Sequence, residues 1–516
     1  MSWSSVCSLD EVLPDTGVCA LLHGRQVAIF RSEDSVYALD NCDPASDVNV
    51  LSRGIVGDVQ GERVVASPLY KHHYSLTTGR CIEDSAKSVQ VFPARVMDGR
   101  IWVNTEPQAA RVRRRLVVIG NGMAGMRTVE ELLRLAPDVY DISVFGAEPH
   151  VNYNRILLSP LLAGEKCVAE IILHPPEWYA EHGVTLHAGD PAVHIDRCRR
   201  IVRSRNGIEL QYDRLVIATG SKPIILPVPG AQLHGVVTFR DLADVDAMLA
   251  AARRFSQAIV IGGGLLGLEA ANALVRRGMQ VTVVHLFGSL MERQLDESAA
   301  TLLRASLEAR GLKFRMPAKT SAILGEERVT GVRFDDGTQL DADLVVMAAG
   351  VRPNTELAVL AGLRCERGVL VDDTLQSFDP SIYAVGECVQ HRNNTFGLVA
   401  PLWEQARVCA AHLAEVGVSR YRGSVTATQL KVTGIDLYSA GDFADADGSE
   451  TLVMRDHRRG VYKRLVIRDN KLRGAVLYGD ARDGAWYFDL MTAGRDITAL
   501  RDHLLFGPAV AEEAAS

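Results

Sequence analysis

Two segments of this chain carry glycines at the spacing that binds the pyrophosphate of a dinucleotide. Each segment follows a run of four apolar residues and reads Gly-x-Gly-x-x-Gly. The glycines are Gly120, Gly122 and Gly125 in the first segment, and Gly262, Gly264 and Gly267 in the second. The first glycine makes a tight turn, the second lets the backbone approach the pyrophosphate, and the third lets helix and strand pack closely. The pyrophosphate then lies at a helix N-terminus. Two copies predict two nucleotide cofactors.

The residue expected to bind the adenosine ribose differs between the two segments. Glu148 follows the predicted strand 141–145 and lies about 20 residues beyond Gly125, where a carboxylate binds the ribose. The equivalent predicted strand 280–284 ends at His285 rather than at an acid. His285 and Arg293 are therefore candidates near the second ribose, where a 2′-phosphate favours positive charge. The choice between NADH and NADPH stays open.

Composition indicates a large protein with no excess of positive charge. The chain has 516 residues, enough for roughly three to five domains. Its formal net charge of −7 gives no overall attraction to nucleic acid or to an anionic membrane. The basic run 111–115 is interpreted as a solvated linker. The chain begins without a secretory signal and has no apolar run long enough to span a bilayer, so a cytoplasmic location is expected.

The pattern of apolar runs predicts a multi-domain chain. Residues 1–107 have short alternating runs typical of a small all-β domain. Alternating strands and helices then predict two α/β Rossmann-like domains, one inserted in the other. Segments 343–350 and 382–387 are expected to return to the first sheet. The predicted ranges are 116–235 and 340–415 for the first α/β domain, and 236–339 for the second.

Residues 416–516 predict a small α+β domain. Its expected strands are 452–454, 462–467 and 474–478, and its expected helix is 497–505. The segment contains no recognisable catalytic group. We interpret it as a surface for dimerisation or for docking a partner.

Longer sequence segments, beyond the two glycine motifs, also resemble a known family. The chain resembles the two-dinucleotide flavoprotein reductases, and more closely the FAD/NAD(P)H half of the large subunit of pyridine-nucleotide-dependent nitrite reductase. The phrases that carry the resemblance are 116–132, 153–159, 290–296 and 397–405. It implies FAD in the first α/β domain and NADH or NADPH in the second, with hydride passing from nicotinamide to flavin. Because the cofactors carry this chemistry, no catalytic residue is assigned.

The N-terminal segment resembles the small subunit of the same enzyme. That subunit is a Rieske-like β domain, and the resemblance rests on segments 49–57 and 65–73. A Rieske cluster needs two cysteines and two histidines, arranged as C-x-H and C-x-x-H. The aligned positions here are Cys42, Pro44, Ser67 and Tyr70. Only Cys42 is kept, so the domain is expected to hold no cluster, and no metal ligand is assigned.

The resemblance also implies further residues at the two cofactor sites. Asn154 and Arg155 are expected on the flavin side, and Glu269 toward the nicotinamide. The motif containing Thr219 and Gly220 is expected to close a turn near FAD. Gly386 and Glu387 occupy the place where related flavoproteins have Gly-Asp at the ribityl chain, and Glu387 is a longer acid than usual.

The expected role is the reductase arm of nitrite or nitrate assimilation. The chain reaches Ser516 without the cysteine-rich and sirohaem segments of the family's large subunit. The resemblance therefore implies that electrons pass to a separate nitrite or nitrate reductase subunit or to an iron–sulfur carrier. A reductase for a rubredoxin, ferredoxin or oxygenase is the alternative, and a flavin-bearing sensor or scaffold without turnover is a third. A homodimer is left open. Cys167 and Cys198 have no near partner, which excludes the disulfide-reductase form.

Overall fold

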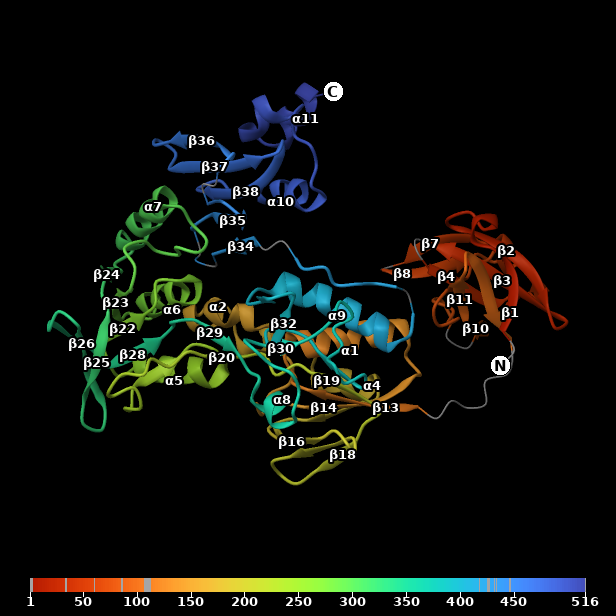
Figure 1. The fold of residues 1–516 in the computed structure, drawn as a ribbon, viewed down its shortest axis with the longest axis horizontal. Coiled ribbons are helices and arrows are strands. Elements are labelled where there is room, and N and C mark those ends of the chain that lie inside the picture. Colours follow the sequence, from red (N-terminus) through yellow and green to blue (C-terminus); the bar gives the residue numbers. More distant parts are fainter. Residues whose placement is uncertain are drawn as a thin grey trace.

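The computed structural model describes residues 3–32, 35–59, 61–84, 87–105, 113–416, 418–424, 427–430, 432, 434–444 and 447–515. Residues 106–112, which include the first two residues of the expected basic linker 111–115, lie outside these ranges. The described chain forms an N-terminal β domain, two α/β units and a C-terminal α+β domain (Figure 1).

The N-terminal domain is built entirely of β-strands, apart from two short 3-10 turns. Residues along β3 alternate between two clusters: Ala28 and Phe30 belong to one, and Val27 and Ile29 to the other. Alternation follows from the two-residue period of a strand, so β3 lies between both halves of the core. The strands are β1 (Trp3–Ser8), β2 (Thr16–Leu22), β3 (Arg25–Ser32), β4 (Ser35–Asp40), β5 (Cys42–Asp43), β6 (Val48–Asn49), β7 (Ile55–Val59), β8 (Glu62–Ala66), β9 (His73–Ser75), β10 (Val91–Phe92), β11 (Ala94–Met97) and β12 (Arg100–Asn104).

The first α/β unit has a parallel sheet in the order β15-β14-β13-β19-β31. Helices α1 and α9 lie side by side over this sheet (Figure 1). The elements before the insertion are β13 (Arg114–Ile119), α1 (Met123–Leu135), β14 (Tyr140–Phe145), α2 (Leu158–Ala163), α3 (Val168–Ile171), α4 (Pro176–Glu181), β15 (Val184–His187), β16 (Ala192–Asp196), β17 (Ile201–Ser204), β18 (Glu209–Gln211) and β19 (Arg214–Ile217). Those after it are α8 (Glu356–Leu360), β30 (Val369–Leu370), β31 (Ile382–Ala384), β32 (Val389–His391), β33 (Asn394–Thr395) and α9 (Val399–Leu413).

The second α/β unit has its own parallel sheet, in the order β21-β28-β22-β23-β24. A two-stranded antiparallel ribbon of β20 (Ser221–Pro223) and β29 (Val351–Pro353) joins the units. The elements of the second unit are β21 (Val236–Thr238), α5 (Leu242–Ala252), β22 (Gln257–Ile261), α6 (Leu265–Arg276), β23 (Gln280–Val284), α7 (Glu297–Glu308), β24 (Lys313–Arg315), β25 (Thr320–Gly325), β26 (Val329–Phe334), β27 (Gln339–Asp341) and β28 (Leu344–Met347).

The pairing of β28 corrects one expectation from the sequence. Segment 343–350 was expected in the first sheet, but β28 pairs with β21 and β22 of the second. The range predicted for the second unit, 236–339, therefore ends too early. An apolar run specifies a buried strand but not its neighbours. Segment 382–387 does contain a strand of the first sheet, since β31 pairs with β19.

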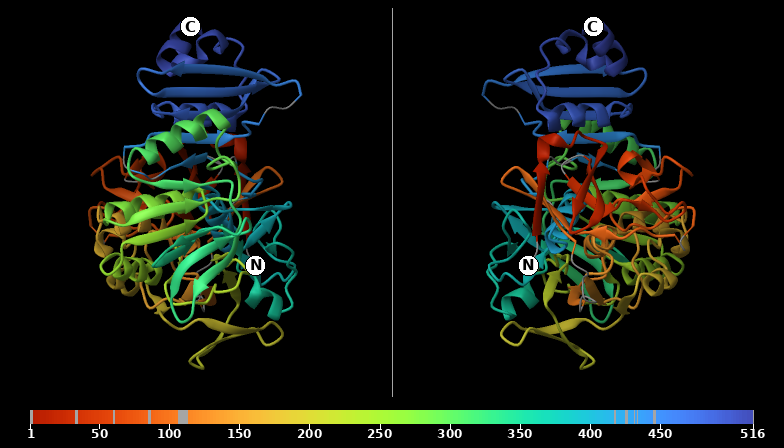
Figure 2. Two further views of the ribbon diagram at one scale, coloured as in Figure 1. Left: turned by 90° about the vertical axis from the view of Figure 1, so that its left-hand side faces the viewer. Right: turned by 90° about the vertical axis from the view of Figure 1, so that its right-hand side faces the viewer.

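The C-terminal domain is an antiparallel sheet, β34-β35-β38-β37-β36, packed against helices. It docks on α7 of the second unit, where Tyr462 donates a hydrogen bond to Asp296 at 2.7 Å and Arg455 donates one to Ser298 at 2.6 Å. Figure 2 shows this stacking from two sides. Its elements are β34 (Ala427–Gln429), β35 (Leu437–Gly441), β36 (Glu450–Asp456), β37 (Val461–Arg468), β38 (Lys471–Tyr478), α10 (Gly484–Ala493) and α11 (Pro508–Ala515).

The helix expected over 497–505 is wrong in type and extent. The segment contains turns and a short 3-10 helix, Arg501–Phe506. The carboxylate of Asp496 accepts a hydrogen bond from the Thr498 backbone at 2.9 Å, and residues 498–500 form turns before the 3-10 helix begins. Among the described residues, no helix has the length and apolar character needed to cross a membrane.

Candidate cofactor sites

The first glycine motif forms an open cradle at the start of α1. Gly120 has a φ of +123°, and a Cβ there would lie 2.1 Å from the Ala218 carbonyl oxygen. A Cβ on Gly125 would lie 2.4 Å from the Gly120 carbonyl oxygen. A Cβ on Gly122, in contrast, would meet no heavy atom of the described chain within 4 Å. Two positions thus require glycine for packing, and the third leaves space beside the helix.

The second motif repeats this geometry at the start of α6. Gly262 has a φ of +132°, and a Cβ there would lie 2.2 Å from the Ala348 carbonyl oxygen. A Cβ on Gly267 would lie 2.0 Å from the Gly262 carbonyl oxygen, while one on Gly264 would meet no described atom within 4 Å. Ala218 directly follows β19, and Ala348 directly follows β28. In each unit the glycine turn therefore packs against the end of the neighbouring strand.

The two helices leave their first backbone N–H groups available to an anion. Gly122 and Gly264 are the N-cap residues of α1 and α6, and no described side chain caps either helix. The first N–H groups of an α-helix have no partner within the helix, and the helix dipole favours negative charge there. Both cradles fit the pyrophosphate of a dinucleotide. The residues present therefore fit the pyrophosphate group that FAD and NAD(P)H share, and they do so in both units.

A chain of charged groups crosses from the first unit toward the second. Arg155 is paired with Glu148 and donates a hydrogen bond to the Arg240 backbone oxygen at 3.0 Å. The Arg240 guanidinium is paired in turn with Glu387, which also accepts the Ser221 hydroxyl at 2.8 Å. Burial alone would lower the pKa of Arg155, but Tyr153 and Glu148 outweigh it and raise that pKa. These side chains form a fixed, charged network at the edge of the first sheet.

Several predicted residues have local roles in holding this edge. Asn154 accepts a hydrogen bond from the Ile156 backbone at 3.0 Å and so caps the turn that carries Arg155. The Thr219 hydroxyl donates to the Asn354 backbone oxygen at 2.6 Å, across the ribbon between the units. Gly220, next in the chain, has a φ of +67°. These contacts hold the backbone of the site in place.

Gly386 lies close to the first cradle. It has a φ of +93°, and a Cβ there would lie 2.9 Å from the Cβ of Ala124, in the first turn of α1. Its N–H donates to the buried Gln405 side chain at 2.8 Å. Glu387, the next residue, is therefore held near the start of α1, and its side chain is only 14% exposed. Glu387 lies in a turn between β31 and β32, and an ordinary solvated acid in a turn would be far more exposed.

Glu269 lies at the contact between the two units. It sits near the start of α6, is buried, and accepts a hydrogen bond from the Ser159 hydroxyl of α2. α2 belongs to the first unit and packs along α6 of the second. Glu269 thus faces the first unit rather than solvent, the direction expected for a residue near the nicotinamide.

The ends of the two second strands differ in their charged groups. His285 follows β23 and is buried; it accepts a hydrogen bond from the Gly263 backbone N–H at 3.0 Å. Its other ring nitrogen lies 3.1 Å from a carboxylate oxygen of Glu292. Arg293 is exposed. The structure therefore brings His285 onto the cradle together with Glu292.

The N-terminal domain does not fit an iron–sulfur cluster. At the aligned positions, Ser67 donates a hydrogen bond to the fully buried carboxylate of Asp43, which also accepts from Tyr74 at 2.7 Å and from the Ala45 backbone at 2.9 Å. The Cys42 thiol lies 3.5 Å from a carboxylate oxygen of Asp47. No group of three or more potential metal ligands is present among the described residues. Hydrogen bonds to Asp43 hold together the two loops that would otherwise hold a cluster.

Sequence reasoning missed Ser221, Arg240, Glu292 and Asp43. Arg240 follows a short strand, and its partner Glu387 is 147 residues further along the chain. Nothing local connects them. Glu292 had a usable signal, because its position seven residues after His285 places it in the loop that follows the ribose-binding strand.

The comparisons with known proteins identify the class of protein that these sites define. The model for pyridine nucleotide-disulphide oxidoreductases matches residues 114–412. This is more than half of the chain, and the chain belongs to that family. A Rieske-like [2Fe-2S] domain model matches residues 2–104, and the rubredoxin NAD+ reductase C-terminal domain matches residues 427–495. The all-β N-terminal domain and the α/β reductase fold predicted from the sequence are confirmed.

Particular relatives narrow the class. Over 386 residues the chain is 47% identical to a nitrite reductase [NAD(P)H] of Bacillus subtilis (strain 168), covering 75% of this chain and 48% of the relative. It is 44% identical over 393 residues to an assimilatory nitrate reductase electron transfer subunit of the same organism, covering 76% and 51%. The chain thus spans about half the length of these relatives.

A solved structure shows the same arrangement of the reductase part. The covalent putidaredoxin reductase–putidaredoxin complex gives a TM-score of 0.70 at 25% identity, covering 78% of this chain and 98% of the reductase chain. Together with the two glycine cradles, these matches place the chain in the pyridine nucleotide-disulphide oxidoreductase family, whose two-nucleotide fold it shares.

Proposed function

We propose that this chain is the NAD(P)H-oxidising arm of assimilatory nitrite or nitrate reduction, and that it delivers electrons to a separate catalytic subunit. The observation that carries the proposal is its similarity, at 47% and 44% identity, to a nitrite reductase and to a nitrate reductase electron transfer subunit. In both, the similarity covers about three quarters of this chain.

The chain's own residues bind and orient the two nucleotides. When bound, FAD accepts a hydride from reduced nicotinamide and releases electrons to an acceptor. The cradle at Gly122 would hold the FAD pyrophosphate, and the cradle at Gly264 that of NAD(P)H. Arg240 and Glu387 would place charged and hydrogen-bonding groups beside the flavin, while α2 packs along α6 at the contact between the two units.

Cysteine chemistry is not part of the proposal. All nine cysteines are free, and Cys388 and Cys409 are fully buried. Burial raises the pKa of the Cys388 thiol to about 11, so it stays protonated and unreactive near neutral pH. The electron path therefore runs through the bound nucleotides rather than through a disulfide.

A reductase for rubredoxin, ferredoxin or an oxygenase is the second candidate. The C-terminal domain matches that of rubredoxin NAD+ reductase, and the chain is 35% identical over 289 residues to a rubredoxin-NAD(+) reductase of Ectopseudomonas oleovorans. The sensor or scaffold without turnover has no comparable support, because these relatives are named as reductases or electron transfer subunits.

Anaerobic stopped-flow absorbance distinguishes the candidates. We expect NADH or NADPH to bleach the flavin, and a nitrite or nitrate reductase catalytic subunit to reoxidise it faster than rubredoxin or a [2Fe–2S] ferredoxin does. Faster reoxidation by rubredoxin or ferredoxin would favour the second candidate. Flavin that no reduced nucleotide bleaches would refute both and leave the scaffold.

The N-terminal domain is proposed to dock the acceptor. Its described residues include no group of three or more potential metal ligands, and Leu69 and Tyr70, at the position of a cluster-binding loop, are 50% and 63% exposed. Removing residues 1–107 should raise the KM for the protein acceptor and leave ferricyanide reduction unchanged. An unchanged acceptor KM with intact flavin would contradict docking. The cytoplasmic location and the homodimer stay predictions.

A further inference from the structure

The choice between NADH and NADPH depends on the charge beside the adenosine 2′ position. In this fold the residue after the second strand contacts the 2′-hydroxyl when it is an acid, while a nearby arginine accommodates a 2′-phosphate. Here that residue is His285, directly after β23. The side chains that surround His285 therefore decide which nucleotide fits.

Hydrogen bonding fixes the protonation of His285. The Gly263 backbone N–H can only donate, so Nδ1, at 3.0 Å, must be the acceptor. The ring hydrogen is then on Nε2, which points at a Glu292 oxygen 3.1 Å away. An imidazole that accepts at one nitrogen and donates at the other is neutral. His285 thus brings no positive charge for a 2′-phosphate.

Glu292 supplies negative charge at the same place. Its side chain is 30% exposed, so the carboxylate contacts both His285 and solvent. The Phe287 ring stands edge-on to the His285 ring, with centroids 5.6 Å apart, and is about half exposed. An apolar ring and an acceptor carboxylate, both fixed to the cradle through His285, suit an adenosine with a free 2′-hydroxyl.

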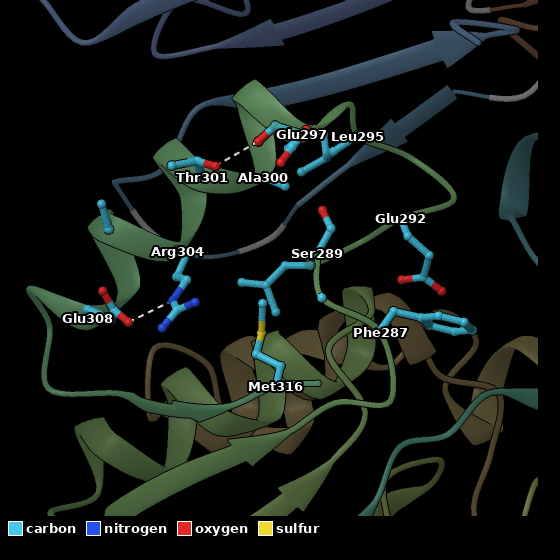
Figure 3. Close-up of a pocket in the computed structure, with 13 residues that line it drawn as sticks. Phe287, Ser289, Glu292, Leu295, Glu297, Ala300, Thr301, Arg304, Glu308 and Met316 are labelled. Atoms are coloured by element: carbon cyan, nitrogen blue, oxygen red, sulfur yellow. Dashed lines mark hydrogen bonds and ion pairs between the residues drawn. The ribbon is translucent and has the colours of Figure 1, made fainter. Parts of the chain in front are cut away.

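Nearby arginines do not reverse this charge. A cavity of about 730 Å³ lies between the loop after β23 and α7, and Glu292 and Phe287 lie together at one side of it (Figure 3). Arg304 lies on the other side, where it donates to Glu308 at 2.8 Å (Figure 3). Arg293 is exposed and adjoins Glu292 in sequence. Arg315, whose backbone oxygen accepts from the His285 N–H at 3.1 Å, directs its guanidinium to Asp336 at 2.7 Å. Arg293 is the competing group that the test must separate.

We propose that Glu292, positioned by His285, accepts the adenosine 2′-hydroxyl and makes the site select NADH over NADPH. The inference rests on the second cradle binding the nucleotide. A 2′-phosphate would face the carboxylate at close range, and repulsion between like charges would weaken its binding.

Calorimetric binding of NAD+ and NADP+ to the FAD-loaded, oxidised protein tests the inference without turnover. Wild type should bind NADP+ at least about tenfold more weakly than NAD+, because the added phosphate carries more than one negative charge. E292Q should narrow this ratio by about tenfold, chiefly through tighter NADP+ binding. Flavin absorbance and near-ultraviolet circular dichroism establish that the variant is folded.

R293Q is the competing test, because Arg293 is the other ribose candidate in the same loop. It should change the NAD+ to NADP+ ratio less than E292Q does. E308Q, which neutralises an acid on the far side of the cavity, is the control and should leave the ratio within about twofold of wild type. Tighter NADP+ than NAD+ binding in wild type, or a ratio that R293Q changes and E292Q does not, would overturn the role of Glu292. Loss of both nucleotides, with no flavin bleaching by either reduced form, would instead refute the assignment of the second cradle and the inference with it.

Discussion

The reductase units and the N-terminal domain differ in whether the position of a cofactor is open or filled by a side chain. At the two glycine cradles, Gly122 and Gly264 border space that no described side chain occupies. In the N-terminal domain, the position between the two cluster-type loops is filled by the buried carboxylate of Asp43, which accepts hydrogen bonds from Ser67 and Tyr74. In the reductase units, backbone N–H groups at the two helix starts stay available to a ligand. In the N-terminal domain, the polar groups of the loops are hydrogen-bonded to Asp43.

This difference shows two ways in which polar groups around a cofactor position find hydrogen-bond partners. Backbone N–H groups at a helix start need a partner, and an anion supplies one. Loops that have lost metal ligands also need a bond between them, because buried polar groups are costly when unpaired. Asp43 accepts three hydrogen bonds and so provides that link. Hydrogen bonds to Asp43 can therefore hold the two loops of the N-terminal domain in place.

The largest effect should come from filling one cradle at a time. In G122A the new methyl group enters the space proposed for the FAD pyrophosphate, so FAD affinity should fall by about tenfold to a hundredfold. In G264A the flavin should stay bound, while NAD(P)H binding weakens by a similar factor. Flavin absorbance per protein and anaerobic flavin bleaching measure the two losses separately.

G125A is the control for packing damage in the same motif. A Cβ there would lie 2.4 Å from the Gly120 carbonyl oxygen, so this variant should lose stability as well as FAD. G122A should instead keep its secondary structure by circular dichroism. A G122A protein that holds FAD as tightly as wild type would place the pyrophosphate elsewhere.

A smaller effect is expected from neutralising the charged network beside the first cradle. E387Q keeps the shape of the side chain but replaces a charged acceptor of Arg240 and Ser221 by a neutral one. Hydrogen bonds to charged groups exceed neutral ones by about 1 kcal/mol, so FAD affinity should fall by about fivefold. Reconstitution of the apoprotein with FAD measures it. E356Q, which removes the exposed pair with Lys222, should leave the affinity unchanged.

The sequence predicts the parts of this molecule that depend on local geometry. The glycine cradles follow from spacing alone, because a positive φ and a close helix–strand contact each exclude a side chain. Distant pairings do not follow. Leu344–Met347 is an apolar strand whose sheet depends on its neighbours, and Arg240 meets Glu387 only after the second unit is inserted. Asp43 resembles an ordinary turn acid in the sequence, and only folding places it between the loops.

The smallest effect on electron transfer should come from replacing Asp43, the residue that fills the position between the two cluster-type loops. D43N should weaken the N-terminal domain by about 1–3 kcal/mol, because a buried amide cannot accept all the hydrogen bonds that the carboxylate does. NADH–ferricyanide activity should not change. Hydrogen exchange of peptides spanning 42–46 and 65–75, in the full chain, measures the local loss. Unchanged protection there would show that Asp43 does not hold the loops together.

The pH dependence of that protection sharpens the test. Burial raises the pKa of Asp43, but hydrogen bonds from Ser67, the Ala45 backbone and Tyr74 outweigh it, and the net pKa is lowered. Stability from a lowered carboxyl pKa is fully present above the unfolded value of about 4 and is lost as pH falls through the folded value. Wild type should therefore lose protection of these loops below about pH 4. D43N, compared with it at each pH, should show no such step, because its amide does not titrate. An equal step in both proteins would assign the pH dependence to other groups, and Asp43 would then be an ordinary buried acid rather than the group that replaces the cluster.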